Sequence, residues 1–207
     1  MQTTKIELNE GINDTILFPS WIKTVYNDTS RNFAEQFNQV LLKKIHATNN
    51  LLDSFWKMNN QIPEINELKN FIVDEAEKVI EQYFGVIDEK YHRSNVYKIK
   101  MERCWLNLNI PGEGDTPHHH RGSAFSSVFY IKTHPKSGDL ILLDPRTTSA
   151  MTTYVIEHKN GGIQTDRAYR RITPKTGTLL FFPSHLIHYV ETNLSPYDRL
   201  CLACNFG

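Results

Sequence analysis

Three histidines have the types and the spacing of a metal site. His118 and His120 are two positions apart, and because side chains alternate between the faces of a β-strand, their imidazoles should point the same way. His188 follows a distant apolar segment and could bring a third imidazole to them. Imidazoles suit iron, zinc, copper or nickel, and three ligands leave positions open for a substrate and for oxygen or water. The pattern therefore predicts a catalytic metal site.

An arginine follows this set. Arg199 comes eleven residues after His188, and in a strand it would share one face with Cys201 and Ala203. A planar guanidinium binds a carboxylate through two parallel hydrogen bonds. We therefore expect an anionic co-substrate beside the metal; an ion pair with Asp198 is the alternative.

Two neighbouring histidines are not expected to bind the metal. His119 should point away from it, because it alternates with His118 and His120. His185 lies three positions before His188 and would face the other side of a regular strand, so we expect it to be packed or to support the ligands.

The second part of the chain is predicted to be β. From about residue 97, short runs of β-branched and aromatic residues alternate with Gly, Pro, Asn and Asp. Without helical interruption, such strands favour a sandwich or barrel such as a jelly roll over residues 96–207. The expected strands are 96–109, 123–132, 139–143, 152–157, 169–173, 178–182, 187–191 and 198–206.

The first part, residues 1–95, is predicted to form a strand and two helices that pack on this core. Apolar residues at helical spacing indicate a first helix capped at Thr29 or Ser30. A second helix should begin at Pro63 and stop at Gly85. We expect one compact domain, mainly β with an N-terminal helical layer.

Composition excludes several classes of protein. The chain has 207 residues, with 23 basic and 23 acidic side chains, so its charge argues against nucleic acid as a partner. It shows no signal peptide and no apolar stretch that could span a membrane, so we expect a cytoplasmic protein. Exposed aromatic residues such as Trp21 or Trp56 could form a homodimer surface.

The three cysteines are too few for a disulfide framework, and we expect reduced thiols. Cys201 and Cys204 have the spacing of a redox or zinc motif. In a buried strand, however, residues three apart face opposite sides, so packing in the core is the favoured interpretation.

The order His-x-His, Gly-x-x-x-x-Phe-Pro, His, Arg resembles that of the iron(II)- and 2-oxoglutarate-dependent oxygenases, which fold as a double-stranded β-helix (a cupin-like jelly roll). The C-terminal half also resembles an uncharacterised bacterial and phage subgroup of these oxygenases. The segments that carry this likeness are Trp105-Leu106-Asn107, Pro117-His118-His119-His120, Ser126-Ser127-Val128-Phe129-Tyr130, Asp144-Pro145-Arg146 and Phe182-Pro183-Ser184 to His188.

The resemblance implies that His118, His120 and His188 bind iron(II) and that Arg199 holds the distal carboxylate of 2-oxoglutarate. His120 stands where most of the superfamily has Asp or Glu, which leaves the iron more positive. The implied reaction is hydroxylation of a small-molecule or peptide substrate by O2, with release of succinate and carbon dioxide.

Three weaker candidates complete the predicted site. Tyr130 and Asn107 lie on strands that should line the same cavity and could bind the co-substrate, although a strand tyrosine often serves only in packing. Arg146 could bind a substrate anion at the rim of the cavity, or simply form a turn.

Two other functions stay open. A cupin-like three-histidine metal dioxygenase or isomerase would not use 2-oxoglutarate, and Arg199 would then bind the substrate. A jelly-roll binding module could also have kept the scaffold and lost catalysis.

Overall fold

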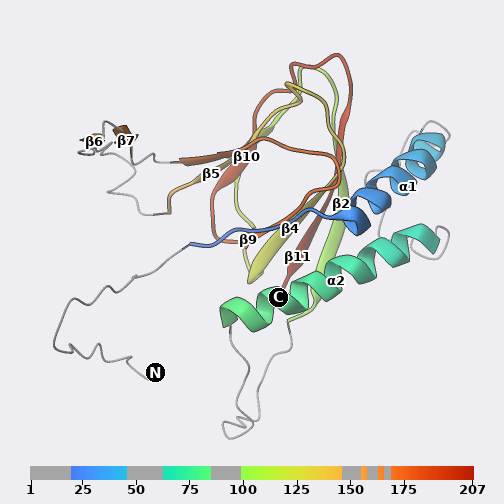
Figure 1. Ribbon diagram of the computed structural model, residues 1–207, viewed down its shortest axis with the longest axis horizontal. Helices are drawn as coiled ribbons and strands as arrows, with labels where there is room; N and C mark the ends of the chain where they lie inside the picture. The colour runs from blue at the N-terminus through green and yellow to red at the C-terminus, as the bar shows by residue number, and fades with distance from the viewer. Residues whose placement is uncertain (1–19, 46–62, 85–98, 146–154, 158–162, 166–168) are drawn as a thin grey trace, which may run out of the picture.

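The computed structural model describes residues 20–45, 63–84, 99–145, 155–157, 163–165 and 169–207 (Figure 1). These residues form helices and strands in the order β1 Lys23–Val25, α1 Asp28–Ile45, α2 Pro63–Phe84, β2 Met101–Asn109, β3 Asp115–His118, β4 Phe125–Lys132, β5 Leu140–Leu143, β6 Val155–Glu157, β7 Ile163–Thr165, β8 Tyr169–Ile172, β9 Leu179–Pro183, β10 His188–Val190 and β11 Arg199–Phe206.

Two antiparallel sheets form the body of the molecule. The five-stranded sheet has the order β1-β9-β4-β11-β2, and the four-stranded sheet has the order β3-β10-β5-β8. Among the strands that the structure describes, β6 and β7 pair only with each other. The prediction of a mainly β, jelly-roll-like fold with a helical layer is therefore confirmed.

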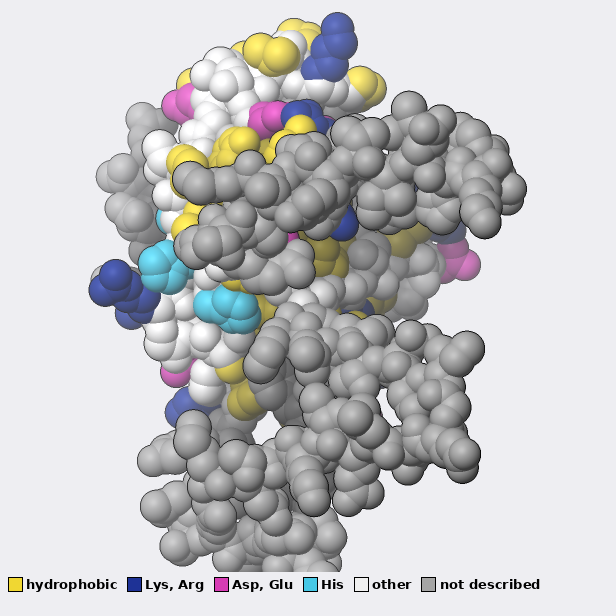
Figure 2. Space-filling model, turned by 90° about the vertical axis from the view of Figure 1, so that its left-hand side faces the viewer, with side chains coloured by type: hydrophobic (Ala, Val, Ile, Leu, Met, Phe, Trp, Pro, Cys, Tyr) yellow, Lys and Arg dark blue, Asp and Glu magenta, His cyan; other side chains and the backbone are white. Residues whose placement is uncertain are grey.

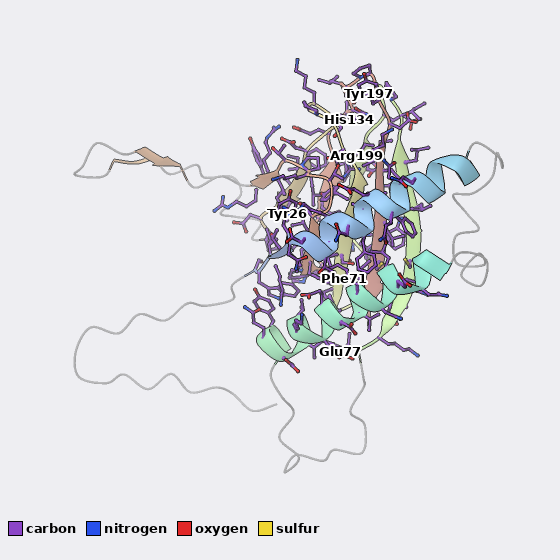
Figure 3. All side chains as sticks on the ribbon, turned by 45° about the vertical axis from the view of Figure 1, so that its right-hand side comes forward. Tyr26, Phe71, Glu77, His134, Tyr197 and Arg199 are labelled. Atoms are coloured by element: carbon purple, nitrogen blue, oxygen red, sulfur yellow. The ribbon has the colours of Figure 1, made fainter. Side chains whose placement is uncertain are left out.

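Both helices cover one face of the five-stranded sheet (Figures 1 and 3). Phe37 of α1 and Leu68 and Ile72 of α2 are almost fully buried in one cluster with the apolar residues of β2, β4, β9 and β11. The opposite face of this sheet contributes to a second buried cluster, which includes Tyr130 and Cys201. The central strands β4, β9 and β11 are therefore buried on both faces, and the second cluster lies on the side away from the helices.

The alternation of side chains in β11 agrees with the expectation for the cysteines. Cys201 belongs to the cluster away from the helices and Cys204 to the cluster beneath them, so the two thiols face opposite sides. Cys204 instead contacts Cys104 across the strand pair, with the sulfur atoms 3.3 Å apart. All three cysteines are free and buried.

The first helix begins earlier than expected. Asn27, rather than Thr29 or Ser30, is its N-cap, because the Asn27 Oδ1 accepts a hydrogen bond from the Ser30 backbone N–H at 2.9 Å. The Ser30 hydroxyl in turn accepts from the Asn27 N–H at 3.0 Å, which completes a capping box. Helix α2 begins at Pro63 as predicted and ends at Phe84, directly before Gly85.

Every predicted strand is present, but two others were missed. β3 and β7 are short, and β3 is rich in polar residues, so neither has a clear apolar pattern. The predicted boundary between residues 95 and 96 lies outside the described residues and stays a prediction. None of the helices that the structure describes is long and apolar enough to cross a membrane.

Candidate metal centre

The structure brings the three predicted histidines together. One ring nitrogen from each of His118, His120 and His188 lies within 4.8 Å of the others. His118 and His188 are direct partners in the β3–β10 pair, and their ring centroids are 4.4 Å apart. Strand β3 ends at His118, so His120 lies just beyond the strand, and its backbone N–H donates to the Ser184 carbonyl at 3.0 Å. Figure 2 shows histidine side chains reaching the surface on one face of the molecule.

Backbone carbonyls orient two of the rings. The Nδ1 of His118 lies 2.7 Å from the Thr116 carbonyl oxygen, and the Nδ1 of His188 lies 2.8 Å from that of Leu186. Because a carbonyl can only accept, each Nδ1 carries the proton and each Nε2 keeps its lone pair. This tautomer is the one that a metal-binding imidazole needs when it coordinates through Nε2.

Burial keeps two of these rings neutral. It lowers the pKa of His188 to about 4, against the opposing effect of the Leu186 carbonyl. It also lowers the pKa of His120 to about 4, assisted by the charges of His118, His119 and Arg103. Since only a neutral imidazole binds a metal, both rings are ready to do so at neutral pH.

An inner cavity of about 260 Å³ extends from the histidines between the two sheets. Arg199, only 1% exposed, lies in its wall, and Figure 3 shows its place among the strands. The cavity is lined by Trp105, Asn107, Asp115, His118, His120, Ser126, Ser127, Val128, Tyr130, Leu140, Phe182, His188, Val190, Arg199, Cys201, Ala203 and Asn205.

Three lining residues have a polar atom that is buried without a hydrogen-bond partner among the described residues. They are Ser127, through its hydroxyl, and Arg199 and Tyr130, through the Nε and the phenol hydroxyl. The guanidinium carbon of Arg199 lies 5.2 Å from the centroid of the Tyr130 ring, and burial raises the pKa of that phenol, which therefore stays protonated. Unpaired buried donors are costly, so the wall suits an anionic ligand that accepts from both Arg199 and Tyr130.

The donor set thus fits the two groups that the sequence implies. Three imidazoles, of which His118 and His188 have a free Nε2, could hold iron(II), and the Arg199 and Tyr130 donors could hold the carboxylate of 2-oxoglutarate. Asn107 also lines the cavity, as predicted, but its Nδ2 is already bound to Asp115 at 2.9 Å. Its role toward a co-substrate stays a prediction.

Sequence reasoning missed Asp115 and Asn109. The Asn109 Oδ1 accepts a hydrogen bond from the Arg199 Nη1 at 2.7 Å, and its Nδ2 donates to Asp115 at 3.1 Å. The only signal in the sequence was the position of each residue. Asn109 comes two residues after Asn107 and so lies on the same face of a strand, and Asp115 lies shortly before His118.

The remaining candidates lie elsewhere. His119 is exposed and does not line the inner cavity, which agrees with the prediction. His185 is also exposed, so the expectation that it is packed or supports the ligands was wrong. It lies in the turn between β9 and β10, where strand alternation does not apply. Arg146 lies outside the described residues.

A second hollow, the outer groove, adjoins the inner cavity. It measures about 460 Å³ and is lined by Glu102, Arg103, Cys104, Trp105, His120 and Asn205. Trp105, His120 and Asn205 line both spaces. The Oδ1 of Asn205 accepts from the Ser126 hydroxyl at 2.9 Å, which fixes the orientation of its amide where the two spaces meet.

Two antiparallel sheets that enclose a triad of imidazoles and a buried arginine define the class of a jelly-roll protein with a candidate metal site. Residues 103–205, which include all residues of the inner cavity, match the family model described as "Putative 2OG-Fe(II) oxygenase". The chain belongs to this family through that segment. Iron(II) and 2-oxoglutarate are accordingly the cofactor and co-substrate that its family implies.

Solved structures share the fold. A Pseudomonas putida prolyl-4-hydroxylase aligns with 89% of this chain and 86% of its own, at 14% identity and a TM-score of 0.57. HygX from Streptomyces hygroscopicus, solved with nickel and 2-oxoglutarate, aligns over 91% and 83% at 11% identity and a TM-score of 0.58.

A Burkholderia pseudomallei oxidoreductase of the 2OG-Fe(II) oxygenase family aligns over 53% of this chain and 45% of its own, at 16% identity and a TM-score of 0.41. This chain therefore spans less than half the length of that protein. No curated protein matches the chain.

Proposed function

We propose that this protein is an iron(II)- and 2-oxoglutarate-dependent dioxygenase that hydroxylates a small-molecule or peptide substrate. The overall reaction is R–H + O2 + 2-oxoglutarate → R–OH + succinate + CO2. The observation that carries the proposal is the buried Arg199, whose Nε lacks a partner in the described region, in the same cavity as three convergent imidazoles.

Each part of the cavity has a proposed task. His118, His120 and His188 would hold iron(II) through Nε2, and the bound metal and co-substrate would supply the oxygen activation that side chains lack. Arg199 would bind the distal carboxylate of 2-oxoglutarate, and the Tyr130 hydroxyl would donate to the same group.

Apolar side chains would keep this pocket poor in water. Val128, Leu140, Phe182 and Val190 line the cavity beside the polar groups, and all four are buried. Excluding water strengthens an arginine–carboxylate contact, because the local dielectric constant falls. It also protects the reaction from side reactions with solvent.

The substrate would approach through the outer groove. Trp105 packs edge-on against His120, with ring centroids 5.5 Å apart, and offers an apolar surface next to the metal site. Arg103 lines the groove and has no hydrogen-bond or ion-pair partner among the described residues, so it could receive an anionic group of the substrate. A cytoplasmic location and a homodimer stay predictions from the sequence.

The test is co-substrate binding to the iron(II)-loaded protein without oxygen. We expect 2-oxoglutarate to produce a charge-transfer absorption band and, once air is admitted, succinate. The Arg199→Met variant should bind iron(II) like the wild type but need far more 2-oxoglutarate, while Arg170→Met, an exposed arginine on β8, serves as the control.

The same test separates the other two functions. His120 in place of a carboxylate favours the three-histidine dioxygenase as second candidate, and that enzyme would bind iron(II) but give neither the band nor succinate. A binding module without catalysis would take up no divalent metal, and His188→Ala would not change its thermal stability in iron(II).

A further inference from the structure

An irregularity in β3 places a carboxylate in the inner cavity. Strand β3 pairs with β10 so that His118 lies opposite His188 and Asp115 lies opposite Val190. Three residue steps on β3 therefore match two steps on β10, which is a β-bulge. In a regular strand, positions 115 and 118 would face opposite sides. The bulge turns both side chains into the inner cavity, where both are among the lining residues.

Both oxygens of this carboxylate are occupied. Its Oδ2 accepts from the Asn107 Nδ2 at 2.9 Å, and its Oδ1 accepts from the Asn109 Nδ2 at 3.1 Å. Among the described residues, the cluster that could hold a metal contains the three histidines and not Asp115. The carboxylate therefore acts on the asparagines rather than on the metal.

The hydrogen bonds of Asp115 also affect Arg199, through the amide of Asn109. An asparagine amide can present either its oxygen or its NH2 to a neighbour, but a carboxylate accepts only. Asp115 therefore holds the Asn109 NH2 toward itself and turns the Asn109 oxygen toward Arg199, whose Nη1 donates to it at 2.7 Å. With Nη1 held there, the Nε of the guanidinium stays unpaired within the described region.

We propose that Asp115 is a positioning residue for the co-substrate: it selects the Asn109 amide orientation that aims Arg199 at an incoming carboxylate. This inference rests on the function proposed above. Asp115 also places a negative charge within electrostatic reach of the buried guanidinium, which balances its charge before the co-substrate arrives.

Two substitutions separate orientation from charge. In Asp115→Asn, the new amide oxygen can still accept from the Asn109 Nδ2, provided that Asn107 turns its own amide so that its oxygen faces the new NH2. The Asn109 orientation can then be kept, because the Arg199 Nη1 can only donate to the Asn109 oxygen, while the charge is lost. In Asp115→Leu both are lost. We expect 2-oxoglutarate to bind the manganese(II)-loaded Asp115→Leu protein about tenfold more weakly than the Asp115→Asn protein, the loss typical of a misplaced charged hydrogen bond. Titration calorimetry gives both Kd values.

Manganese affinity, measured separately, should agree within about twofold among the wild type and both variants, since Asp115 is no ligand. Asn109→Ala should weaken 2-oxoglutarate binding as Asp115→Leu does, and the double variant should be no weaker than either, because both act through one path to Arg199.

Equal 2-oxoglutarate affinity in Asp115→Leu and Asp115→Asn would overturn the inference. It would also be overturned if the fold-increase in the Kd of the double variant equalled the product of the increases in Asp115→Leu and Asn109→Ala. In either case a wild type that binds 2-oxoglutarate leaves the proposed function standing. A wild type that binds manganese but no 2-oxoglutarate would overturn the proposed function and this inference together. Far-UV circular dichroism confirms that each variant is folded.

Discussion

At the scale of single residues, the cavity combines side chains that are fully paired with others that are not. The rings of His118 and His188 are held through Nδ1 by backbone carbonyls, whereas the Arg199 Nε and the Tyr130 hydroxyl have no partner in the described region. The paired atoms fix the ligand geometry in advance. The unpaired atoms mark where a bound anion would contribute most.

Tyr130→Phe should separate stability from binding. Without co-substrate, the change removes a buried hydroxyl that has no described partner, so the melting temperature should stay equal or rise. With 2-oxoglutarate, the variant loses a donor and its Kd should increase about five- to tenfold. Thermal melts and calorimetry test both, and Tyr197→Phe, at an exposed position, is the matched control. A lower melting temperature together with an unchanged Kd would contradict the assigned role.

The buried histidines predict a pH dependence of the metal-free protein. The pKa values of His120 and His188 are lowered from 6.5 to about 4 in the folded state, so the unfolded state binds more protons between these values. Stability should therefore fall as the pH drops from about 6.5 to about 4, and these two groups contribute no change above that window. Urea unfolding across the window tests this. The free energy of unfolding should fall less steeply with decreasing pH in the double variant His120→Gln/His188→Gln than in the wild type. Equal slopes in the two proteins would refute the role of these histidines.

How far the site could be predicted differs from residue to residue. The three histidines and Arg199 were identifiable because metal ligands and an anion-binding arginine have a distinctive type and spacing. Asp115 and Asn109 were not, because their placement depends on one extra residue in β3 and on an amide orientation. Neither the extra residue in β3 nor the amide orientation can be recognised from the sequence. His185 was misjudged because strand alternation was extended into a turn.

At the scale of elements, local chemistry sets the boundaries that position the site. Gly177 precedes β9 with φ at +84°, and a Cβ there would lie 3.0 Å from the Arg31 Cα, so glycine allows α1 to pack against this turn. Most strands were predictable from their apolar runs, but β3 and β7, which lack such a run, were not. The start of α1 was misplaced by the sequence pattern because Asn27, Thr29 and Ser30 are all good capping residues.

Asn27→Ala should test the capping box. It removes the acceptor for the Ser30 N–H and should lower the free energy of unfolding by about 1 kcal/mol. Chemical denaturation measures the change, and Gln36→Ala, at an exposed position inside α1, should have little effect. An equal loss in the two variants would argue against a specific cap.

At the scale of the whole molecule, the two faces of the five-stranded sheet have different roles. One face packs on the helices and supplies the larger apolar cluster, and the other face helps to form the inner cavity. This division was predictable in outline, because strands buried on both faces read as continuous apolar runs. The residues of β11 that line the cavity follow strand alternation from Arg199 to Asn205, whereas in β4 Ser127 lines it together with both of its neighbours, against that rule.

Leu68→Ala should test this separation. Leu68 lies on α2 and is fully buried beneath the sheet, so truncation should cost about 2–5 kcal/mol of stability. Because it does not line the inner cavity, manganese affinity of the folded protein should stay unchanged. Denaturation and metal titration measure the two effects, and a large loss of affinity at temperatures where the variant is folded would contradict the separation.

The position of His120 just beyond the end of β3 has a mechanical consequence. His118 and His188 belong to the four-stranded sheet. The backbone N–H of His120, in contrast, is hydrogen-bonded to Ser184, which directly follows β9, and its ring packs against Trp105 of β2. Both β9 and β2 belong to the five-stranded sheet. An ion shared by all three rings would therefore act as a cross-link between the two sheets. Loading the metal should slow amide hydrogen exchange in both sheets at once, and not only next to the ligands.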